Sequence, residues 1–264
     1  MSLRAPNHFP VCYVFRVVQT PGRRYPRRER LTAMERLDRV IIALPEQSRQ
    51  RVRRVLLEGR VRVNRTVERD GTRMLTAFDR VEFDDRLLRP GRTPRYLMLY
   101  KPGGCISATR DDRHPTALEL LGADATEDLH IAGRLDYHTT GLLLLTNDSE
   151  WSERLTQPGS RKPKRYCVDL ARPLHQRDVE AFATGIRLRH ETTDTLPAIL
   201  EIEHAHRAWV TLFEGRYRQI RRMFATLGNH VVALHRERVG GIVLDPGLSP
   251  GEYRPLEMEE IAAA

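Results

Sequence analysis

The sequence contains few cysteines, few aromatic residues and no long apolar run. Its three cysteines lie far apart, at Cys12, Cys105 and Cys167, and this spacing suits neither a disulfide framework nor a zinc site. No segment approaches the roughly 18 consecutive apolar residues of a membrane-spanning helix, and residues 1–33 lack the apolar stretch of a secretory leader. We therefore expect a cytoplasmic protein that is independent of membranes and holds no metal ion.

The motifs of several enzyme classes are also missing. The chain has no G-x-S-x-G, G-x-G-x-x-G, H-E-x-x-H or G-x-x-x-x-G-K-[ST] pattern, which argues against a nucleophile-elbow hydrolase, a dinucleotide-binding enzyme, a zincin and a P-loop nucleotidase. His204 and His206 lie two positions apart, but no further ligand follows at a recognisable spacing, so we interpret them as surface histidines.

Positive charge is in excess, with a formal net charge of +9, but it is unevenly distributed. Residues 1–33 hold seven arginines against one acid, Glu29, and so carry most of the excess. This stretch is rich in proline and arginine and has no apolar periodicity, so we predict a poorly ordered basic extension that catalysis does not need. Two other interpretations of residues 1–33 stay open: they form an arm that binds RNA, or translation begins at Met34.

A different pattern begins at residue 34. Leu37, Val40, Ile41 and Leu44 recur at the spacing of one helix face, and Ser48 is a suitable N-cap for a second helix that ends near Gly59. Alternating strands follow as far as residue 86. The second helix and the turn after it carry an arginine cluster that favours contacts with phosphates: Arg49, Arg51, Arg53, Arg54, Arg60, Arg62 and Arg65.

Residues 34–86 resemble the small RNA-binding module named after ribosomal protein S4. The resemblance rests on RLD at residues 36–38, SR at 48–49 and G-x-V-x-V-N at 59–64. The chain departs from the module at Arg65, where the family usually has glycine. We therefore expect an S4-type domain over residues 34–86, followed by a linker over residues 87–95.

Residues 96–264 show short strands and helices in mixed order, which predicts an α+β domain with a mixed sheet. A strand at residues 96–100 runs into the glycine-rich turn Lys101-Pro102-Gly103-Gly104. Further strands are expected at LLLLT, KRYCVDL, PAILEIE and RAWVTLFEG, and a long amphipathic helix precedes two final strands.

One aspartate in this domain occupies an unusual setting. The segment GRLDYHTTGLLLLTND, residues 133–148, places Asp136 in a turn immediately before four consecutive leucines. An apolar run of this length between turn residues predicts a fully buried strand, so Asp136 lies on a loop anchored by the core. Such a loop can hold a fixed catalytic side chain, and it equally suits an ordinary Asx-turn.

Two further segments carry candidate side chains. In the helix predicted within EGRYRQIRRMFATLGNH, residues 214–230, Arg222 points almost opposite the apolar stripe and Arg221 lies on its flank. A flanking arginine can hold its guanidinium at the edge of a buried site, where it can pair with a carboxylate; an ordinary surface arginine is the alternative. Tyr166 opens the strand KRYCVDL and is either half-buried in the core or a plate on which an unpaired base stacks.

Taken together, these segments resemble the RsuA/RluA-type pseudouridine synthases. The matching motifs occur in the family's order: K-P-x-G at 101–104, GRLD with T-x-GLLLLTND at 133–148, K-x-Y at 164–166 and EG-x-x-RQIRRMF at 214–224. The C-terminal segment VVALHRERVGGIVLDPGLSPGEYRPL is similar to that of the RsuA subgroup, which modifies one uridine of small-subunit (16S) ribosomal RNA. The resemblance covers essentially all of residues 34–264.

The resemblance implies a mechanism that needs no cofactor, metal or energy source. Asp136 matches the catalytic aspartate, Tyr166 the tyrosine that stacks on the target base, and Arg221 the basic residue paired with the aspartate. Arg134 matches an arginine that helps to fill the space left by the flipped base. We expect Arg221 within salt-bridge reach of Asp136 and Tyr166 facing the same cavity. Contacts with the RNA are expected from Lys101, Lys164, Arg218, Arg222, Arg49, Arg53 and Arg60.

The expected partner is ribosomal RNA, bound by a monomer within a small-subunit assembly intermediate. Two alternatives stay open at this point: a pseudouridine synthase that acts on large-subunit RNA, and a non-catalytic assembly factor that only binds ribosomal RNA. Convergence of Asp136, Tyr166 and Arg221 on one pocket would favour an enzyme over the assembly factor.

Overall fold

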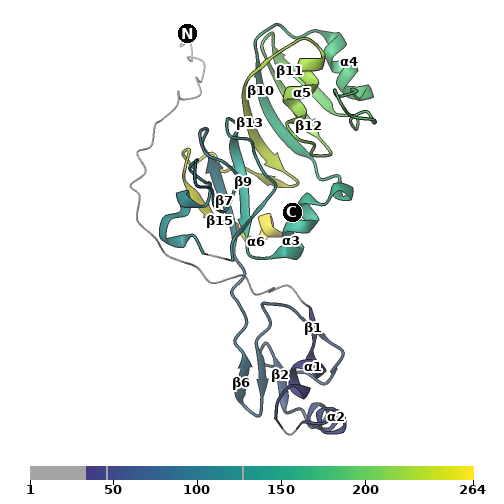
Figure 1. The fold of residues 1–264 in the computed structure, drawn as a ribbon, viewed down its shortest axis with the longest axis vertical. Helices are drawn as coiled ribbons and strands as arrows, with labels where there is room; N and C mark the ends of the chain where they lie inside the picture. Colours follow the sequence, from purple (N-terminus) through teal and green to yellow (C-terminus); the bar gives the residue numbers. More distant parts are fainter. Residues whose placement is uncertain (1–33, 46, 127) are drawn as a thin grey trace. The chain divides into compact units, whose positions relative to one another are not determined.

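The computed structural model describes residues 34–45, 47–126 and 128–264 (Figure 1). The basic extension predicted over residues 1–33 lies outside these ranges. The described residues form two compact units, one ending at Pro94 and the other beginning at Arg95. Each unit has its own hydrophobic core.

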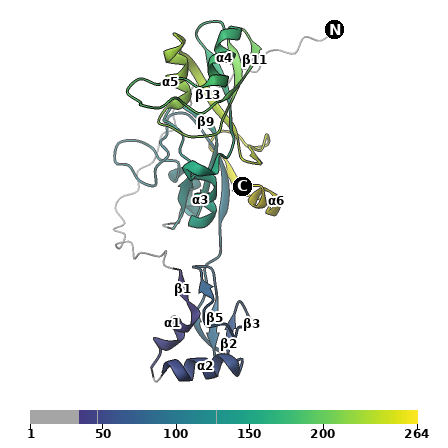
Figure 2. The same cartoon turned by 90° about the vertical axis from the view of Figure 1, so that its right-hand side faces the viewer.

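The first unit packs two short helices against a small antiparallel sheet (Figure 2). Helix α1 spans Leu37–Ile42 and helix α2 spans Arg49–Leu57. Ser48 caps α2 as predicted, because its hydroxyl accepts a hydrogen bond from the N–H of Arg51 at 3.3 Å. The strands are β1 (Glu35–Arg36) paired with β4 (Met74–Leu75), and a sheet of order β3 (Thr66–Val67), β2 (Val61–Val63), β5 (Val81–Phe83) and β6 (Arg86–Arg89).

The turn between β2 and β3 has an uncommon backbone. Asn64 and Arg65 both lie in the left-handed region, with φ of 53° and 68°, and Val63 pairs directly with Thr66. Two positive φ values in a two-residue hairpin loop define a type I′ turn, which favours Asn-Gly. Arg65 therefore bears backbone strain at the position where the S4 module usually carries glycine.

The second unit is built on a nine-stranded mixed sheet whose main path runs β11-β12-β10-β13-β9-β7-β15 (Figure 1). Strands β9 and β13 run parallel, and the other neighbours along this path are antiparallel. The strands are β7 Tyr96–Lys101, β8 His130–Ala132, β9 Thr140–Thr146, β10 Lys164–Leu170, β11 Ile199–His204, β12 Arg207–Leu212, β13 Val231–Val239, β14 Ile242–Val243 and β15 Tyr253–Pro255. The helices are α3 Ser149–Thr156, α4 Gln176–Thr184, α5 Gln219–Thr226 and α6 Met258–Ala262, with 3-10 turns at Glu119–Asp124 and Pro158–Ser160. The predicted α+β class is confirmed.

The four consecutive leucines of β9 face two different cores. Leu143 and Leu145 belong to the larger core, whereas Leu142 and Leu144 pack with Trp151 of α3 in a second core. All four are 0% exposed. Successive residues of a strand point to opposite faces, so a strand without a polar residue must be covered on both faces. The fully buried strand predicted from the sequence is confirmed.

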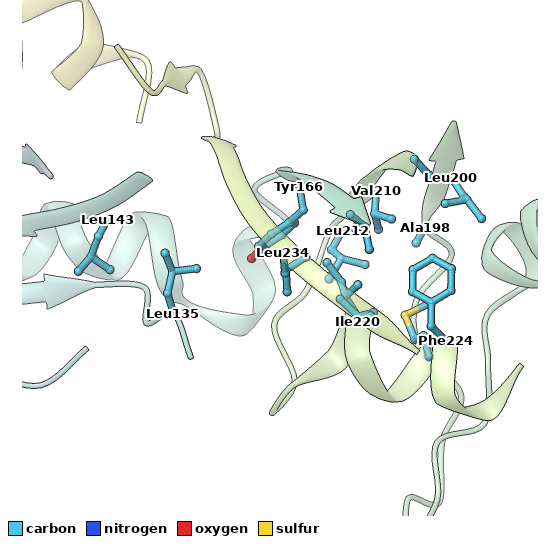
Figure 3. Close-up of a cluster of buried hydrophobic side chains, with 14 of the residues drawn as sticks. Leu135, Leu143, Tyr166, Ala198, Leu200, Val210, Leu212, Ile220, Phe224 and Leu234 are labelled. Atoms are coloured by element: carbon cyan, nitrogen blue, oxygen red, sulfur yellow. The ribbon is translucent and has the colours of Figure 1, made fainter. Parts of the chain in front are cut away.

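The larger core supports the loops that carry the candidate site. Ile220, Met223 and Phe224 of α5 are buried in it, as the predicted apolar stripe requires. Figure 3 shows Phe224 near Ala198, and Ile220 on the side toward Leu234 and Tyr166. One continuous core therefore connects α5 to the strands that lead toward Asp136.

Strands β9 and β13 approach each other most closely at Gly141. This residue pairs with Arg236 and has φ of +105°, and a Cβ placed on it would lie 2.2 Å from the backbone oxygen of Arg236. No side chain fits such a gap without moving backbone. Glycine at position 141 therefore permits the parallel pairing that joins the two halves of the sheet.

His235, next to this contact, makes the fold sensitive to acid. Burial lowers the pKa of His235 to about 4, and its Nδ1 lies 2.9 Å from the hydroxyl of Thr140. The pKa of an unfolded histidine is about 6.5, so between these two values the unfolded chain binds more protons than the folded one. The free energy of unfolding must therefore fall as the pH drops from about 6.5 toward 4.

We expect urea unfolding to show this loss directly. Between pH 7 and pH 4.5, His235 should remove about 2 kcal/mol of stability, and His235→Asn should lose correspondingly less than the wild type over that interval. His204→Asn, at an exposed histidine, serves as the control and should follow the wild-type curve. Equal losses for the wild type and His235→Asn would contradict the assignment.

Candidate active site

Asp136 lies in the loop between β8 and β9, and this loop is held by specific hydrogen bonds. The hydroxyl of Ser107 accepts a hydrogen bond from the N–H of Leu135 (3.0 Å) and donates one to its carbonyl (2.9 Å). The N–H of Thr139 donates to the carbonyl of Asp136 at 3.0 Å. The Asp136 side chain remains 27% exposed, so a rigid backbone presents a carboxylate that a ligand can reach.

A buried lysine supports this loop from within the fold. Lys101, at the end of β7, is 0% exposed, and its Nζ donates to the carbonyls of Pro102 (2.9 Å), Thr139 (2.9 Å) and Tyr137 (3.4 Å). Burial lowers the pKa of Lys101 to about 8, while the charge of Asp136 acts in the opposite direction. The expectation that Lys101 contacts RNA is wrong, because its ammonium group is enclosed and bonded to the Asp136 loop.

A buried arginine supports the other side of the loop, and the sequence analysis did not identify it. Arg236 of β13 is 1% exposed and donates to the carbonyls of Leu142 (2.8 Å), Gly133 (2.9 Å) and Arg134 (3.4 Å). The sequence does contain a signal for its burial: Arg236 lies two residues after Leu234 in a strand, so both side chains point to the same, buried face. A charged residue at an inward-facing position needs buried partners.

The arginine nearest to Asp136 is Arg218, not Arg221. Nε of Arg218 lies 3.8 Å from Oδ2 of Asp136. Among the described residues, Arg221 makes no ion pair with Asp136; its Nη1 donates to the carbonyl of Val231 (3.0 Å), and its buried Nη2 has no hydrogen-bond partner. The predicted Arg221–Asp136 salt bridge is therefore wrong as stated, because the backbone of β13 takes up one side of the guanidinium.

The charge of Asp136 nevertheless affects the pKa of Arg221. Burial lowers the pKa of Arg221, and Asp136 opposes that shift, so the two groups interact through space. Arg222, expected to face solvent or phosphate, is already paired: its Nη1 lies 2.5 Å from Glu191, and it donates to the carbonyls of Tyr217 (3.2 Å) and Arg189 (3.0 Å). Arg222 therefore fixes the neighbouring loops.

One cavity of about 920 Å³ opens beside the carboxylate. Apolar side chains of the larger core line this cavity together with five of the candidate residues: Asp136, Tyr166, Arg134, Lys164 and Arg218. Lys101, Arg221 and Arg222 lie outside the lining. Tyr166 is 9% exposed, with its ring seated among Leu135 and Leu234 (Figure 3). The volume is within the usual range for a small-molecule or nucleotide site.

Lys164 and Arg134 differ in how available they are to a ligand. Arg134 is exposed at the cavity. Lys164 is half-buried, its Nζ donates to the carbonyl of Lys162 at 3.4 Å, and burial, aided by Arg236, lowers its pKa. Arg134 is thus the freer of the two cations for a contact with phosphate.

In the first unit, the three arginines expected to bind RNA are not equivalent. Arg49 and Arg53 are exposed on α2. Arg60 is engaged by Asp84 through two hydrogen bonds of 2.7 and 2.5 Å and by Glu58 at 3.2 Å. Its guanidinium therefore holds a turn of its own unit, which leaves Arg49 and Arg53 as the more available phosphate contacts.

Within the described residues, no group of three or more histidine, cysteine, aspartate or glutamate side chains is arranged to hold a metal ion. The same part of the chain has no helix that is both long and apolar enough to cross a membrane.

Comparison with known proteins gives a consistent result. The family model described as RNA pseudouridylate synthase matches residues 95–226. The chain is 54% identical over 228 residues to a protein of Pseudomonas aeruginosa named ribosomal small subunit pseudouridine synthase A, a match that covers 86% of this chain and 99% of the relative. A protein of the same name from Escherichia coli K12 is 45% identical, with the same coverage.

A solved structure agrees with these relatives. The chain resembles a structure described as the crystal structure of pseudouridylate synthase, at 41% sequence identity and a TM-score of 0.63, covering 86% of this chain and 98% of that one. The matched segment of the family model contains β7, the Asp136 loop, Tyr166 and α5. The chain therefore belongs to the RNA pseudouridylate synthase family.

Proposed function

We propose that this chain converts one uridine of small-subunit ribosomal RNA into pseudouridine, with Asp136 as the catalytic carboxylate. The observation that carries the proposal is the cavity in which Asp136, Arg218 and Tyr166 meet. The choice of small-subunit RNA is supported by the names of relatives that are 54% and 45% identical. A purely RNA-binding factor would have no use for a carboxylate that lies 3.8 Å from an arginine inside a cavity.

The reaction explains why such a pocket is needed. The bond from C1′ to N1 of the uracil breaks, the detached ring turns, and a new bond joins C1′ to C5, while the hydrogen of C5 is lost and N1 gains one. The product is an isomer of the substrate, so no external reactant is consumed. The site must position one nucleophile or base and must keep the free uracil enclosed.

Asp136 meets the first of these needs. It acts either as a nucleophile toward the sugar or the ring, or as the base that removes a sugar proton. The Ser107 clamp and the buried Lys101 fix its loop, while Arg218 stands 3.8 Å from its carboxylate. A carboxylate held in place by structure already formed loses little free energy to reorganisation during the reaction.

Tyr166 and the apolar walls meet the second need. The target uridine must leave its stack, which costs about a few kcal/mol, and stacking on the Tyr166 ring offsets part of that cost. Leu135, Leu234 and Ile220 line the same cavity and exclude water from the detached base. Arg134, exposed at the cavity, is suited to fill the place that the flipped base leaves in the RNA.

The first unit supplies the remaining grip in this proposal. The first unit is an S4-type RNA-binding domain in this proposal. Its last strand, β6 (Arg86–Arg89), extends past the predicted boundary at residue 86, so the linker is shorter than the predicted residues 87–95. Residues 96–264 form the catalytic domain. Exposed arginines such as Arg49 and Arg53 on α2 neutralise phosphates. The protein works as a monomer on a small-subunit assembly intermediate, in which the target uridine is still accessible.

The role of Arg221 is open to a direct test. Its charge interacts with Asp136 from outside the cavity lining, so we expect Arg221→Ala to slow isomerisation by about tenfold to a hundredfold with unchanged RNA affinity. Arg221→Lys, which keeps the charge, should recover most of the rate. Arg177→Ala, at an exposed arginine of α4, is the control. A normal rate for Arg221→Ala would show that Arg218 alone serves Asp136.

The function itself is tested by release of tritium. Uridine that carries tritium at C5 loses the label when C5 bonds to the sugar. Purified protein is therefore incubated with labelled small-subunit assembly intermediates from cells that lack it. We expect release of one equivalent per small-subunit RNA and none from large-subunit particles. Release from large-subunit particles alone would replace the proposed target, and absence of release from both would overturn the proposed function.

A further inference from the structure

A tyrosine at the mouth of the cavity is left uncovered. Tyr217 lines the cavity and is 76% exposed, the largest exposed fraction among the large hydrophobic residues of the described chain. An aromatic ring in water forgoes the free energy that burial would give it. A ring placed at the entrance to a binding cavity gains that free energy when a ligand covers it.

The backbone under Tyr217 is held by hydrogen bonds on both sides. The Tyr217 carbonyl accepts a hydrogen bond from Nη1 of Arg222 at 3.2 Å. On its other side, Arg216 donates to Glu191 (2.5 Å), Glu214 (3.1 Å) and the carbonyl of Thr193 (3.0 Å). This network keeps a rigid turn with the ring on its outer surface, which resembles a preformed platform more than a loose loop.

Arg218 connects this platform to the carboxylate. Its guanidinium carbon lies 5.7 Å from the centre of the Tyr217 ring, and its Nε lies 3.8 Å from Asp136. Arg218 itself has a left-handed backbone, with φ of 47°, which turns the chain sharply from the platform into α5. The ring and the carboxylate are therefore joined through a single side chain.

The charges around Tyr217 indicate what covers it. Arg134, Arg161 and Arg218 are exposed among the residues that line the cavity. The acids of that lining are Asp136 and Glu214, and Glu214 is occupied by Arg216, Gln219 and the N–H of Leu196. The exposed charges along the cavity are thus mainly cationic, and one of them, Arg218, lies next to the ring. This charge suits a phosphate backbone. An aromatic ring among arginines is the usual arrangement for binding unpaired nucleotides.

We propose that Tyr217 is a stacking platform for an unpaired nucleobase that flanks the target uridine. This inference rests on the proposed function, in which the uridine itself enters the cavity beside Tyr166. A second base held outside on Tyr217 would keep the RNA strand splayed at the entrance, so that the flipped uridine is presented to Asp136. The protein would then require a flanking nucleotide that is free of pairing.

The inference is tested with four variants by RNA binding, kinetics and thermal unfolding. Affinity for small-subunit particles from cells that lack the protein is measured by filter binding, and KM and kcat by tritium release. We expect Tyr217→Ala to weaken binding and raise KM by about tenfold, with kcat within about twofold of the wild type. Tyr217→Phe keeps the ring and should behave as the wild type, whereas Tyr217→Leu, which is apolar without a π-face, should stay close to Tyr217→Ala. Met258→Ala, at a 75% exposed residue of α6, should change nothing.

The outcomes separate this inference from the function on which it rests. Wild-type affinity and KM for Tyr217→Ala would overturn the platform, and so would full recovery by Tyr217→Leu, because a plain apolar contact would then suffice. Absence of tritium release by the wild type would instead overturn the proposed function; the binding measurement would still decide whether Tyr217 holds RNA. A lowered melting temperature in Tyr217→Ala, absent from Tyr217→Phe, would assign the ring a structural role and would also overturn the platform.

Discussion

Asp136→Asn should fold and bind RNA like the wild type while releasing no tritium above background. Asparagine keeps the size of the side chain and most of its hydrogen bonding but removes the charge, and with it the capacity to act as nucleophile or base. The expected loss of rate is about ten-thousandfold or more, the upper end of the contribution of a positioned acid-base group, because the reacting carboxylate itself is removed. The measurement is tritium release from small-subunit particles, with filter binding and thermal unfolding alongside.

The control for this prediction is Asp112→Asn, at an exposed aspartate outside the cavity lining. It removes the same charge and should leave the rate unchanged. If Asp136→Asn retained a measurable fraction of the wild-type rate while folded, the catalytic assignment of Asp136 would be wrong. If it lost RNA affinity as well, the carboxylate would have a binding role that the proposed mechanism does not include.

Gly141→Ala should have the largest effect on folding. Its Cβ would lie 2.2 Å from the oxygen, 2.7 Å from the nitrogen and 2.9 Å from the carbonyl carbon of Arg236, all backbone atoms, at a φ of +105°. Neither strand can move cheaply, because β9 is buried on both faces and Arg236 is bonded to three carbonyls of the Asp136 region. We expect a loss of more than about 4 kcal/mol in the free energy of unfolding.

Gly159→Ala provides the matched control, since nothing lies within 4 Å of its added Cβ. Denaturant unfolding of both variants should show a change below about 0.5 kcal/mol for Gly159→Ala. Where Gly141→Ala does not accumulate as folded protein, native-gel and circular-dichroism comparison with Gly159→Ala gives the same answer. Near-wild-type stability of Gly141→Ala would contradict the close approach of β9 and β13.

The local elements of the site could be predicted from the sequence because they rest on short-range patterns. The run of leucines before Asn147 predicted a strand covered on both faces, and the spacing of Ile220, Met223 and Phe224 predicted the buried side of α5. Ser48 predicted the start of α2. Each of these follows from residues within about two helical turns of one another.

The interactions across the sheet could not be predicted in the same way. Lys101 lies 36 positions from Tyr137 and Arg236 lies 103 positions from Gly133, whose carbonyls they bind. A one-dimensional pattern does not show which loops meet. A lysine beside a glycine-rich turn suggested a phosphate contact, yet the fold places it inside. Burial of such a cation is possible only because several carbonyls converge on it.

The partner of Asp136 illustrates the same limit. On a helical wheel, Arg221 occupies the flank of the apolar stripe and is the natural candidate. Arg218 precedes α5 in a left-handed conformation, which no periodicity of the helix can place. The helical periodicity therefore predicted that the N-terminal end of α5 faces Asp136, but it favoured Arg221 over Arg218, which lies three residues earlier.

The central claim is that this chain makes one pseudouridine in small-subunit ribosomal RNA through Asp136. Its most direct test is quantitative mapping of pseudouridine along that RNA in cells lacking the protein, with wild type or Asp136→Asn restored. We predict that one position loses its pseudouridine, that the wild type restores it, and that Asp136→Asn does not. Full modification at every position in cells without the protein would contradict the claim.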